Sequence, residues 1–169
     1  PVSSLTCTTT CTEPHRQHFT FGQLKLSFDS DYCTPAVPNS TGVPTVISAS
    51  GSDFASDNFF TLEASSMPNQ STGLFLASTA QGFAAMPGGS SGNLCLGGAI
   101  GRFVGMGQIQ NSSTTGRIEL ALDLTQHPTP NGFVAVVAGE TWNYQAWHRD
   151  AVGGAVTSNF SNGLSVTFR

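Results

Sequence analysis

Apolar and polar residues alternate along several short stretches of this chain. The alternation is clearest in residues 117–124, RIELALDL, where every second residue is apolar. Successive side chains of a β-strand point to opposite faces, so this pattern predicts a strand with one face in a core. The residues that would face the core are Ile118, Leu120, Leu122 and Leu124.

Other segments predict more strands of the same kind. Residues 57–64 would place Phe60 and Leu62 on one face, and residues 19–28, FTFGQLKLSF, alternate around Gly22, which marks a bulge. Further strands are expected at 46–49, 74–77, 94–96, 133–137, 139–150 and 163–169.

Segments rich in Gly, Pro and Asn separate the predicted strands, including residues 67–73, 87–93 and 127–132, which we expect to be turns. Short strands between such turns are typical of an all-β fold. We therefore predict an antiparallel, jelly-roll-like β-sandwich with little or no helix. It would be one domain over residues 19–169, preceded by an extended, Thr-rich arm over residues 1–18.

Charge is scarce in this chain. Of 169 residues only 9% are charged, Lys25 is the one lysine, and the formal net charge is −4. Nucleic-acid binding needs a basic surface, so this balance argues against it. No apolar run is long enough to span a membrane. The chain begins without Met, and we interpret it as a mature secreted protein whose export signal has been removed.

The four cysteines also indicate a secreted protein. An even number in a chain of this composition suggests two disulfides with three possible connectivities, and disulfides persist in oxidising compartments. We favour Cys7–Cys11 as a small local loop and Cys33–Cys95 as a long-range bond. An extracellular or cell-surface location follows.

Two metal sites, for zinc and for calcium, are alternatives to these interpretations. Cys7, Cys11, His15 and His18 follow a C-x3-C-x3-H-x2-H pattern, but its spacing is tighter than that of usual zinc sites, and oxidation would remove the thiols. Aspartates in turns are suitable calcium ligands, although no known calcium-loop pattern occurs. The candidates are Asp29, Asp31, Asp53 and Asp57.

Residues 139–150, GETWNYQAWHRD, hold both tryptophans of the chain. As a strand, the segment would bury Trp142 and Tyr144 and turn Trp147 to the outer face. A loop or a second subunit would cover Trp147, or a sugar would stack on it. The residues proposed for that interface or sugar contact are Trp147, Asn143, Gln145 and His148.

The triplet His148-Arg149-Asp150 resembles a kinase catalytic loop only in its letters. The glycine-rich loop, the lysine and the DFG motif of kinases are missing. We expect a strand end in which Arg149 and Asp150 pair locally. Residues 88–92, GGSSG, match a G-x-S-x-G motif in letters, but we expect a loop between strands there and not the strand–turn–helix elbow of a hydrolase, which makes a hydrolase the weakest alternative.

The C-terminal half of the chain resembles a known domain in four segments. In order, these are NLCLGGAIGRF, RIELALDL, GETWNYQAWHRD and SNFSNGLSVTF. This half is similar to an uncharacterised β-rich domain found near the C-termini of large secreted or surface proteins of environmental bacteria. The resemblance implies an extracellular, sandwich-like domain. It implies no catalytic residues and no activity.

These observations favour a non-enzymatic structural protein, a self-associating subunit of a surface filament, coat or adhesive appendage. Copies would meet through the N-terminal arm or a sheet edge, because extended segments can add to exposed strands through backbone hydrogen bonds. The alternative is a carbohydrate-binding module that uses an exposed aromatic side chain and has glycans as partners.

Overall fold

A computed structural model describes residues 30–169, which contain thirteen β-strands and two single-turn 3-10 helices. In chain order these are β1 (Asp31–Tyr32), β2 (Val46–Gly51), η1 (Ala55–Asp57), β3 (Phe60–Ser65), β4 (Thr72–Ser78), β5 (Ala80–Ala84), η2 (Pro87–Gly89), β6 (Leu94–Gly97), β7 (Gly101–Arg102), β8 (Gln110–Asn111), β9 (Ile118–Leu122), β10 (His127–Thr129), β11 (Gly132–Val134), β12 (Thr141–Val152) and β13 (Ala155–Thr167).

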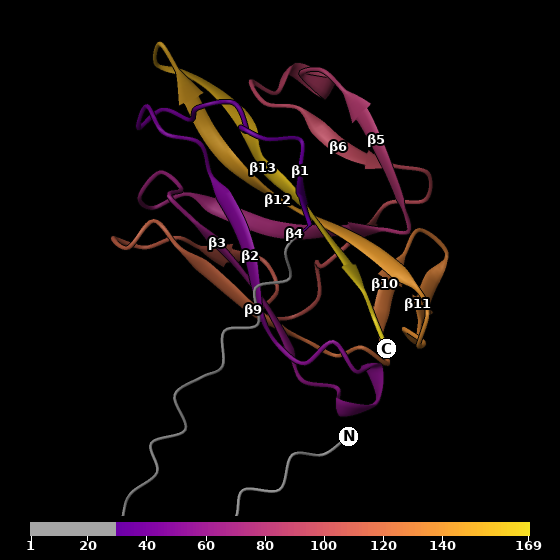
Figure 1. Cartoon of the computed structure of the whole chain (residues 1–169). Helices are drawn as coiled ribbons and strands as arrows, with labels where there is room; N and C mark the ends of the chain where they lie inside the picture. Colours follow the sequence, from indigo (N-terminus) through magenta and orange to yellow (C-terminus); the bar gives the residue numbers. More distant parts are fainter. Residues whose placement is uncertain (1–29) are drawn as a thin grey trace, which may run out of the picture.

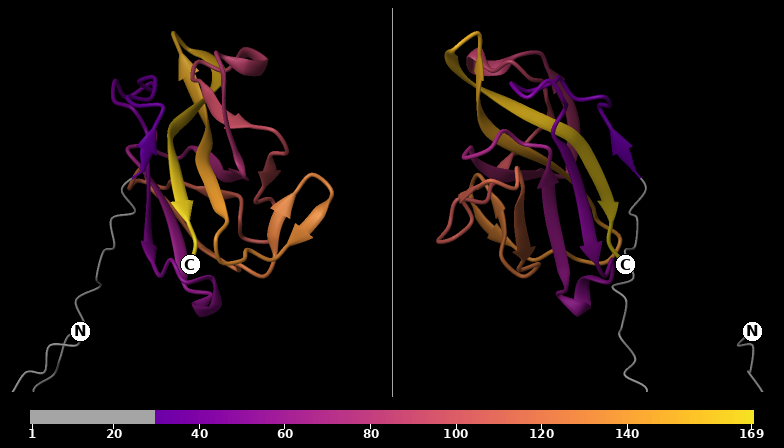
Figure 2. Two further views of the ribbon diagram at one scale, coloured as in Figure 1. Left: turned by 45° about the vertical axis from the view of Figure 1, so that its right-hand side comes forward. Right: turned by 90° about the vertical axis from the view of Figure 1, so that its left-hand side faces the viewer.

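Two antiparallel sheets of unequal size form a sandwich (Figures 1 and 2). The larger sheet runs β1-β13-β12-β4-β7, and β8 also pairs with β4. The smaller sheet has three strands in the order β2-β3-β9. The predicted all-β sandwich is confirmed, and the long β12–β13 hairpin forms the middle of its larger sheet.

One large apolar core lies between the two sheets. The alternation of β3 buries Phe60, Leu62 and Ala64, as the sequence predicted. Burying a large apolar side chain contributes about 1.5–3 kcal/mol, so this core is the main source of stability. The larger sheet supplies Trp142, Tyr144 and Ala146 of β12, and Leu164, Val166 and Phe168 in and after β13.

Two hairpins lie outside these sheets. The β5–β6 hairpin packs on the outer face of the larger sheet, beside β12 and β13 (Figure 1). The β10–β11 hairpin spans residues that were expected to form only a turn, 127–132. Pro128 pairs with Phe133 in this isolated two-stranded ribbon, where a proline is tolerated because its missing N–H faces no further strand.

Strands are found at the other predicted positions, but β13 begins at Ala155, eight residues before the expected 163, and β11 ends at Val134, three residues before the expected 137. Along residues 117–124 the alternation is as expected, with Ile118, Leu122 and Leu124 buried and Leu120 partly buried. Two predictions, the strand over residues 19–28 and the arm over residues 1–18, lie outside the described residues.

Candidate functional site

A second apolar cluster covers part of the outer face of the larger sheet. Alternation along β12 points Trp147 away from the core, and Phe160 of β13 lies directly opposite it in register. Leu76 of β4 belongs to the same cluster. The β5–β6 hairpin covers this cluster in part, through the side chains of Leu94 and Leu96.

The hairpin leaves a groove of about 500 Å³ beside the cluster. This volume lies within the range of small-molecule sites in proteins. The groove is lined mainly by apolar side chains from β4, β6, β12, β13 and the turn before β7. These are Leu74, Leu76, Leu94, Ile100, Trp147 and Phe160.

Two arginines line the same groove. Arg102 comes from β7 and Arg149 from β12, the two strands that flank β4, so the guanidinium groups reach the groove from opposite sides of its floor. No acidic side chain lines the groove in the described chain. The groove is therefore positively charged on a protein whose formal net charge is −4.

The other two arginines of residues 30–169 are neutralised within the fold. Arg117 lies 2.9 Å from the carboxylate of Glu63, and Arg169 lies 2.7 Å from the carboxylate of Asp53. Within the same residues, no salt bridge involves the arginines of the groove. The unpaired cations of the described structure are thus gathered at one site.

Trp147 is partly exposed, and three side chains pack against it. Leu94 of the hairpin and Phe160 belong to the cluster against which it packs, and Arg149 lies over its ring with 5.3 Å between the guanidinium carbon and the ring centroid. A cation over an aromatic ring at an exposed site contributes about 0.5–1 kcal/mol. This contact keeps the Arg149 charge beside the groove.

Asn143 and Gln145, predicted as sugar contacts, are buried and hydrogen-bonded within the protein. The Gln145 amide accepts from the Cys95 N–H at 2.9 Å and donates to the Asn93 and Ser161 carbonyls at 3.0 and 2.7 Å. Asn143 donates to a main-chain carbonyl of β4 and accepts from a β5 side chain. These amides attach the hairpin to the sheet, and they do not lie beside Trp147 on the surface.

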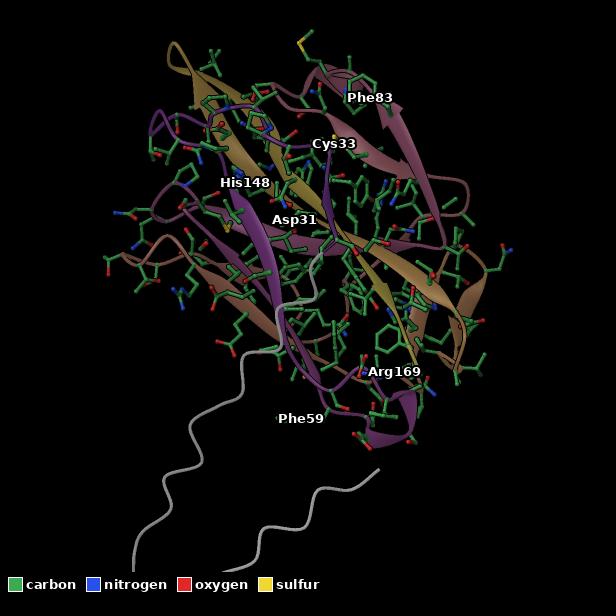
Figure 3. The ribbon with its side chains drawn as sticks, in the orientation of Figure 1. Asp31, Cys33, Phe59, Phe83, His148 and Arg169 are labelled. Carbon is green, nitrogen blue, oxygen red and sulfur yellow. A yellow bond between two sulfur atoms is a disulfide. The ribbon has the colours of Figure 1, made fainter. Side chains whose placement is uncertain are left out.

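His148 is also buried, and it points to the core side of the sheet (Figure 3). Its Nδ1 donates to the Arg149 carbonyl, and its Nε2 accepts from the Thr45 hydroxyl, both at 2.9 Å. A carbonyl can only accept, so Nδ1 carries a hydrogen, and in the neutral ring, which burial favours, Nε2 is then the acceptor. Burial lowers the pKa of His148, against the opposing effects of the Arg149 carbonyl and the Asp150 charge.

The predicted local pair between Arg149 and Asp150 is wrong. The Asp150 carboxylate instead accepts hydrogen bonds from the Ser40 N–H, the Ala151 N–H and the Asn159 amide, at 3.1, 2.9 and 3.2 Å. Burial raises the pKa of Asp150, but these donors outweigh it and lower the pKa below its usual value. Adjacent strand residues point to opposite faces, which separates the two charges.

The Cys33–Cys95 disulfide is present, as predicted, and Cys95 is buried. It joins the chain after β1, at the edge of the larger sheet, to β6 of the hairpin that borders the groove (Figure 3). The predicted Cys7–Cys11 bond lies outside the described residues, as does the alternative zinc site with His15 and His18.

Two of the aspartates proposed as calcium ligands have partners within the protein. Asp53 pairs with Arg169, the Asp57 carboxylate accepts from the Ser52 hydroxyl, and no three His, Cys, Asp or Glu side chains of the described chain gather as metal ligands. Asp29 lies outside these residues. In the same part of the chain, no helix is long and apolar enough to cross a membrane.

Sequence analysis missed Arg102 and the groove itself. Arg102 lies in a glycine-rich segment, on a strand of two residues that has no alternation of its own. The sequence offered one signal for Arg102. The chain has only six basic residues, so each of them is a candidate for a charged binding site.

The chain is an all-β sandwich with an apolar groove, lined also by two arginines, on the outer face of its larger sheet. No known protein family, curated protein or solved structure matches the chain. The resemblance of its C-terminal half to a domain of secreted bacterial proteins stays a prediction.

Proposed function

We propose that this protein is a non-enzymatic, extracellular binding domain that takes a partly apolar ligand into the groove. The observation that supports this function is the part of the outer apolar cluster, including Trp147, that the β5–β6 hairpin leaves open. An apolar pocket with a few polar groups is the usual form of a ligand site. The Cys33–Cys95 disulfide and the low charge support an extracellular location.

A neutral sugar fits this groove less well than an apolar ligand does. Planar amides and carboxylates suit sugar hydroxyls as hydrogen-bond partners, and the described groove lining contains none. Asn143 and Gln145 make their hydrogen bonds inside the protein. Carbohydrate binding through Trp147 therefore ranks below binding of an apolar group, and a glycan array provides its direct test.

Replacing Trp147 by alanine should weaken the binding of a neutral apolar probe, N-phenyl-1-naphthylamine, at least tenfold. Loss of a buried aromatic contact costs about 1.5–3 kcal/mol, which corresponds to this factor. Probe fluorescence at increasing protein concentration measures the affinity. Val156→Ala is the control, because Val156 is 81% exposed near the turn of the β12–β13 hairpin and does not line the groove. Equal affinities of wild type and Trp147→Ala would contradict the proposal.

Self-association as a structural subunit of a surface filament, coat or appendage is the second candidate. Three hairpins each expose a large apolar side chain, Phe83 at 69%, Phe133 at 67% and Val156 at 81% (Phe83 in Figure 3). Contacts between copies would bury such side chains, and a charge-poor surface offers little repulsion against them.

Light scattering over a wide concentration range tests this second candidate. We expect the full chain to associate, and Phe83→Ser with Phe133→Ser to reduce the association constant at least tenfold by removing apolar contact area. Deletion of residues 1–18 tests the proposed arm separately. A chain that stays monomeric throughout would refute self-association and leave groove binding untouched.

A further inference from the structure

We infer that the ligand of the groove is an amphipathic anion, with an apolar body and a carboxylate or chemically equivalent group. This inference rests on the proposed binding function and adds the charge of the ligand to it. Arg102 and Arg149 carry the argument, because both line the groove and neither has a salt-bridge partner within residues 30–169.

The remaining described arginines provide an internal comparison. Arg117 and Arg169, away from the groove, each have a carboxylate at 2.9 and 2.7 Å. The chain has ten acidic residues for six basic ones, so acidic partners are not in short supply. Leaving two cations unpaired beside apolar side chains makes the groove complementary to an anion.

The layout of the groove indicates how such a ligand would lie. Leu74 and Leu76 of β4 form the middle of the floor, between Arg102 on β7 and Arg149 on β12. An apolar chain placed over β4 would have a guanidinium group on either side. A guanidinium binds a carboxylate through paired N–H donors, and each methylene that the ligand buries adds to the affinity.

The stacking of Arg149 on Trp147 supports the same assignment. The contact holds the guanidinium 5.3 Å from the ring centroid, at the edge of the apolar surface. An anion paired with Arg149 would therefore bring its apolar body against Trp147 and Phe160. The indole also provides a readout, because the only other tryptophan, Trp142, is buried in the core.

Three probes with the same ten-carbon tail test the inference in the full-length protein. Titration calorimetry and tryptophan fluorescence would compare decanoate, decan-1-ol and decyltrimethylammonium. Exposed charge pairs are weak, so two arginines should favour decanoate over decan-1-ol by roughly two- to thirtyfold. Decyltrimethylammonium should bind most weakly.

Arginine variants show whether the groove itself causes this preference. Arg102→Gln with Arg149→Gln should abolish the preference for decanoate while decan-1-ol binding changes less than threefold. Arg102→Gln alone leaves the contact between Arg149 and Trp147 in place and should lose part of the preference for decanoate. Arg117→Gln removes the same charge at the Glu63 salt bridge and should keep the full preference.

The outcomes separate the two proposals. Equal binding of decanoate and decan-1-ol would overturn the anionic ligand and leave the apolar groove standing. Failure of all three probes, with unchanged Trp147 fluorescence, would overturn the binding function as well. If Arg117→Gln reduced the preference for decanoate as much as the groove variants do, the preference would come from the overall charge of the protein, which would overturn the inference. A dimer that the double arginine variant dissociates would show that a second copy occupies the groove, which also overturns the inference.

Discussion

Replacing Cys33 and Cys95 together by alanine is expected to lower the free energy of unfolding by about 4 kcal/mol, which is the largest effect we predict. The two residues are 62 positions apart in the sequence, and their bond restricts a long loop of the unfolded chain. A typical domain is stable by only about 5–15 kcal/mol, so much of its stability would be lost. Urea unfolding of oxidised wild type and variant measures the difference.

The same variant should loosen the β5–β6 hairpin before the rest of the sandwich. The Cys95 N–H, which donates to the buried Gln145 amide, should exchange its hydrogen faster, whereas amides of β3 in the core should be protected up to global unfolding. Cys7→Ser with Cys11→Ser controls for the other two cysteines and should change stability less. A loss below 1 kcal/mol in the Cys33–Cys95 variant would show that hydrogen bonds and packing suffice to hold the hairpin.

Stability should also fall steeply as the pH drops from about 6.5 to 4, because of His127. This ring is fully buried between Trp142, at 4.1 Å between ring centroids, and Phe103, at 5.3 Å. Its Nε2 pairs with the Tyr144 hydroxyl at 3.1 Å, and its Nδ1 has no partner in the described chain. A second proton would therefore place a charged N–H in the core without an acceptor.

Burial lowers the pKa of His127 to about 4, from a usual value of 6.5. Between these two values the unfolded chain binds a proton that the folded chain does not, so falling pH favours unfolding. The full difference corresponds to about 3 kcal/mol, and it is reached below pH 4. The lowered pKa of His148 acts in the same direction, and that of Asp150 adds to the loss at still lower pH.

Unfolding in urea at a series of pH values from 7 to 4 checks this prediction. His127→Phe keeps an aromatic ring beside Trp142 but cannot titrate, so it should show a smaller loss over this range, with a constant offset from the unpaired Tyr144 hydroxyl. Adding His148→Gln should flatten the curve further. If wild-type stability did not change between pH 7 and 4, the buried neutral state of His127 would be wrong.

The strands of the core follow from the sequence because each carries its own signal. Ile118, Leu122 and Leu124 alternate with polar residues, and Phe60 and Leu62 do the same, so local periodicity and burial agree. The side-chain split of residues 139–150 was also predictable, with Trp142 and Tyr144 inside and Trp147 outside. Successive side chains of a strand point to opposite faces of its sheet, whatever the neighbouring strands are.

The β10–β11 hairpin shows where local signals mislead. Residues 127–132 contain two prolines, a histidine, an asparagine and a glycine, the composition of a turn. The structure nevertheless buries His127, because the hairpin places it against the aromatic side chains of Phe103, Trp142 and Tyr144. These partners are far away in the sequence or lie on another element, so composition alone could not identify them.

By itself, the sequence determined the all-β class and the core faces of the strands, since periodicity is a local property, and it favoured Cys33–Cys95 among three possible cysteine pairings, a bond that the structure contains. Only the tertiary structure decided what surrounds Trp147. It buried Asn143, Gln145 and His148 in hydrogen bonds that include residues far away in the sequence, and it brought Arg102 and Arg149 to one groove from strands on either side of β4. Sheet order and the position of the hairpin set these contacts, and both arise from long-range pairing that no single segment encodes.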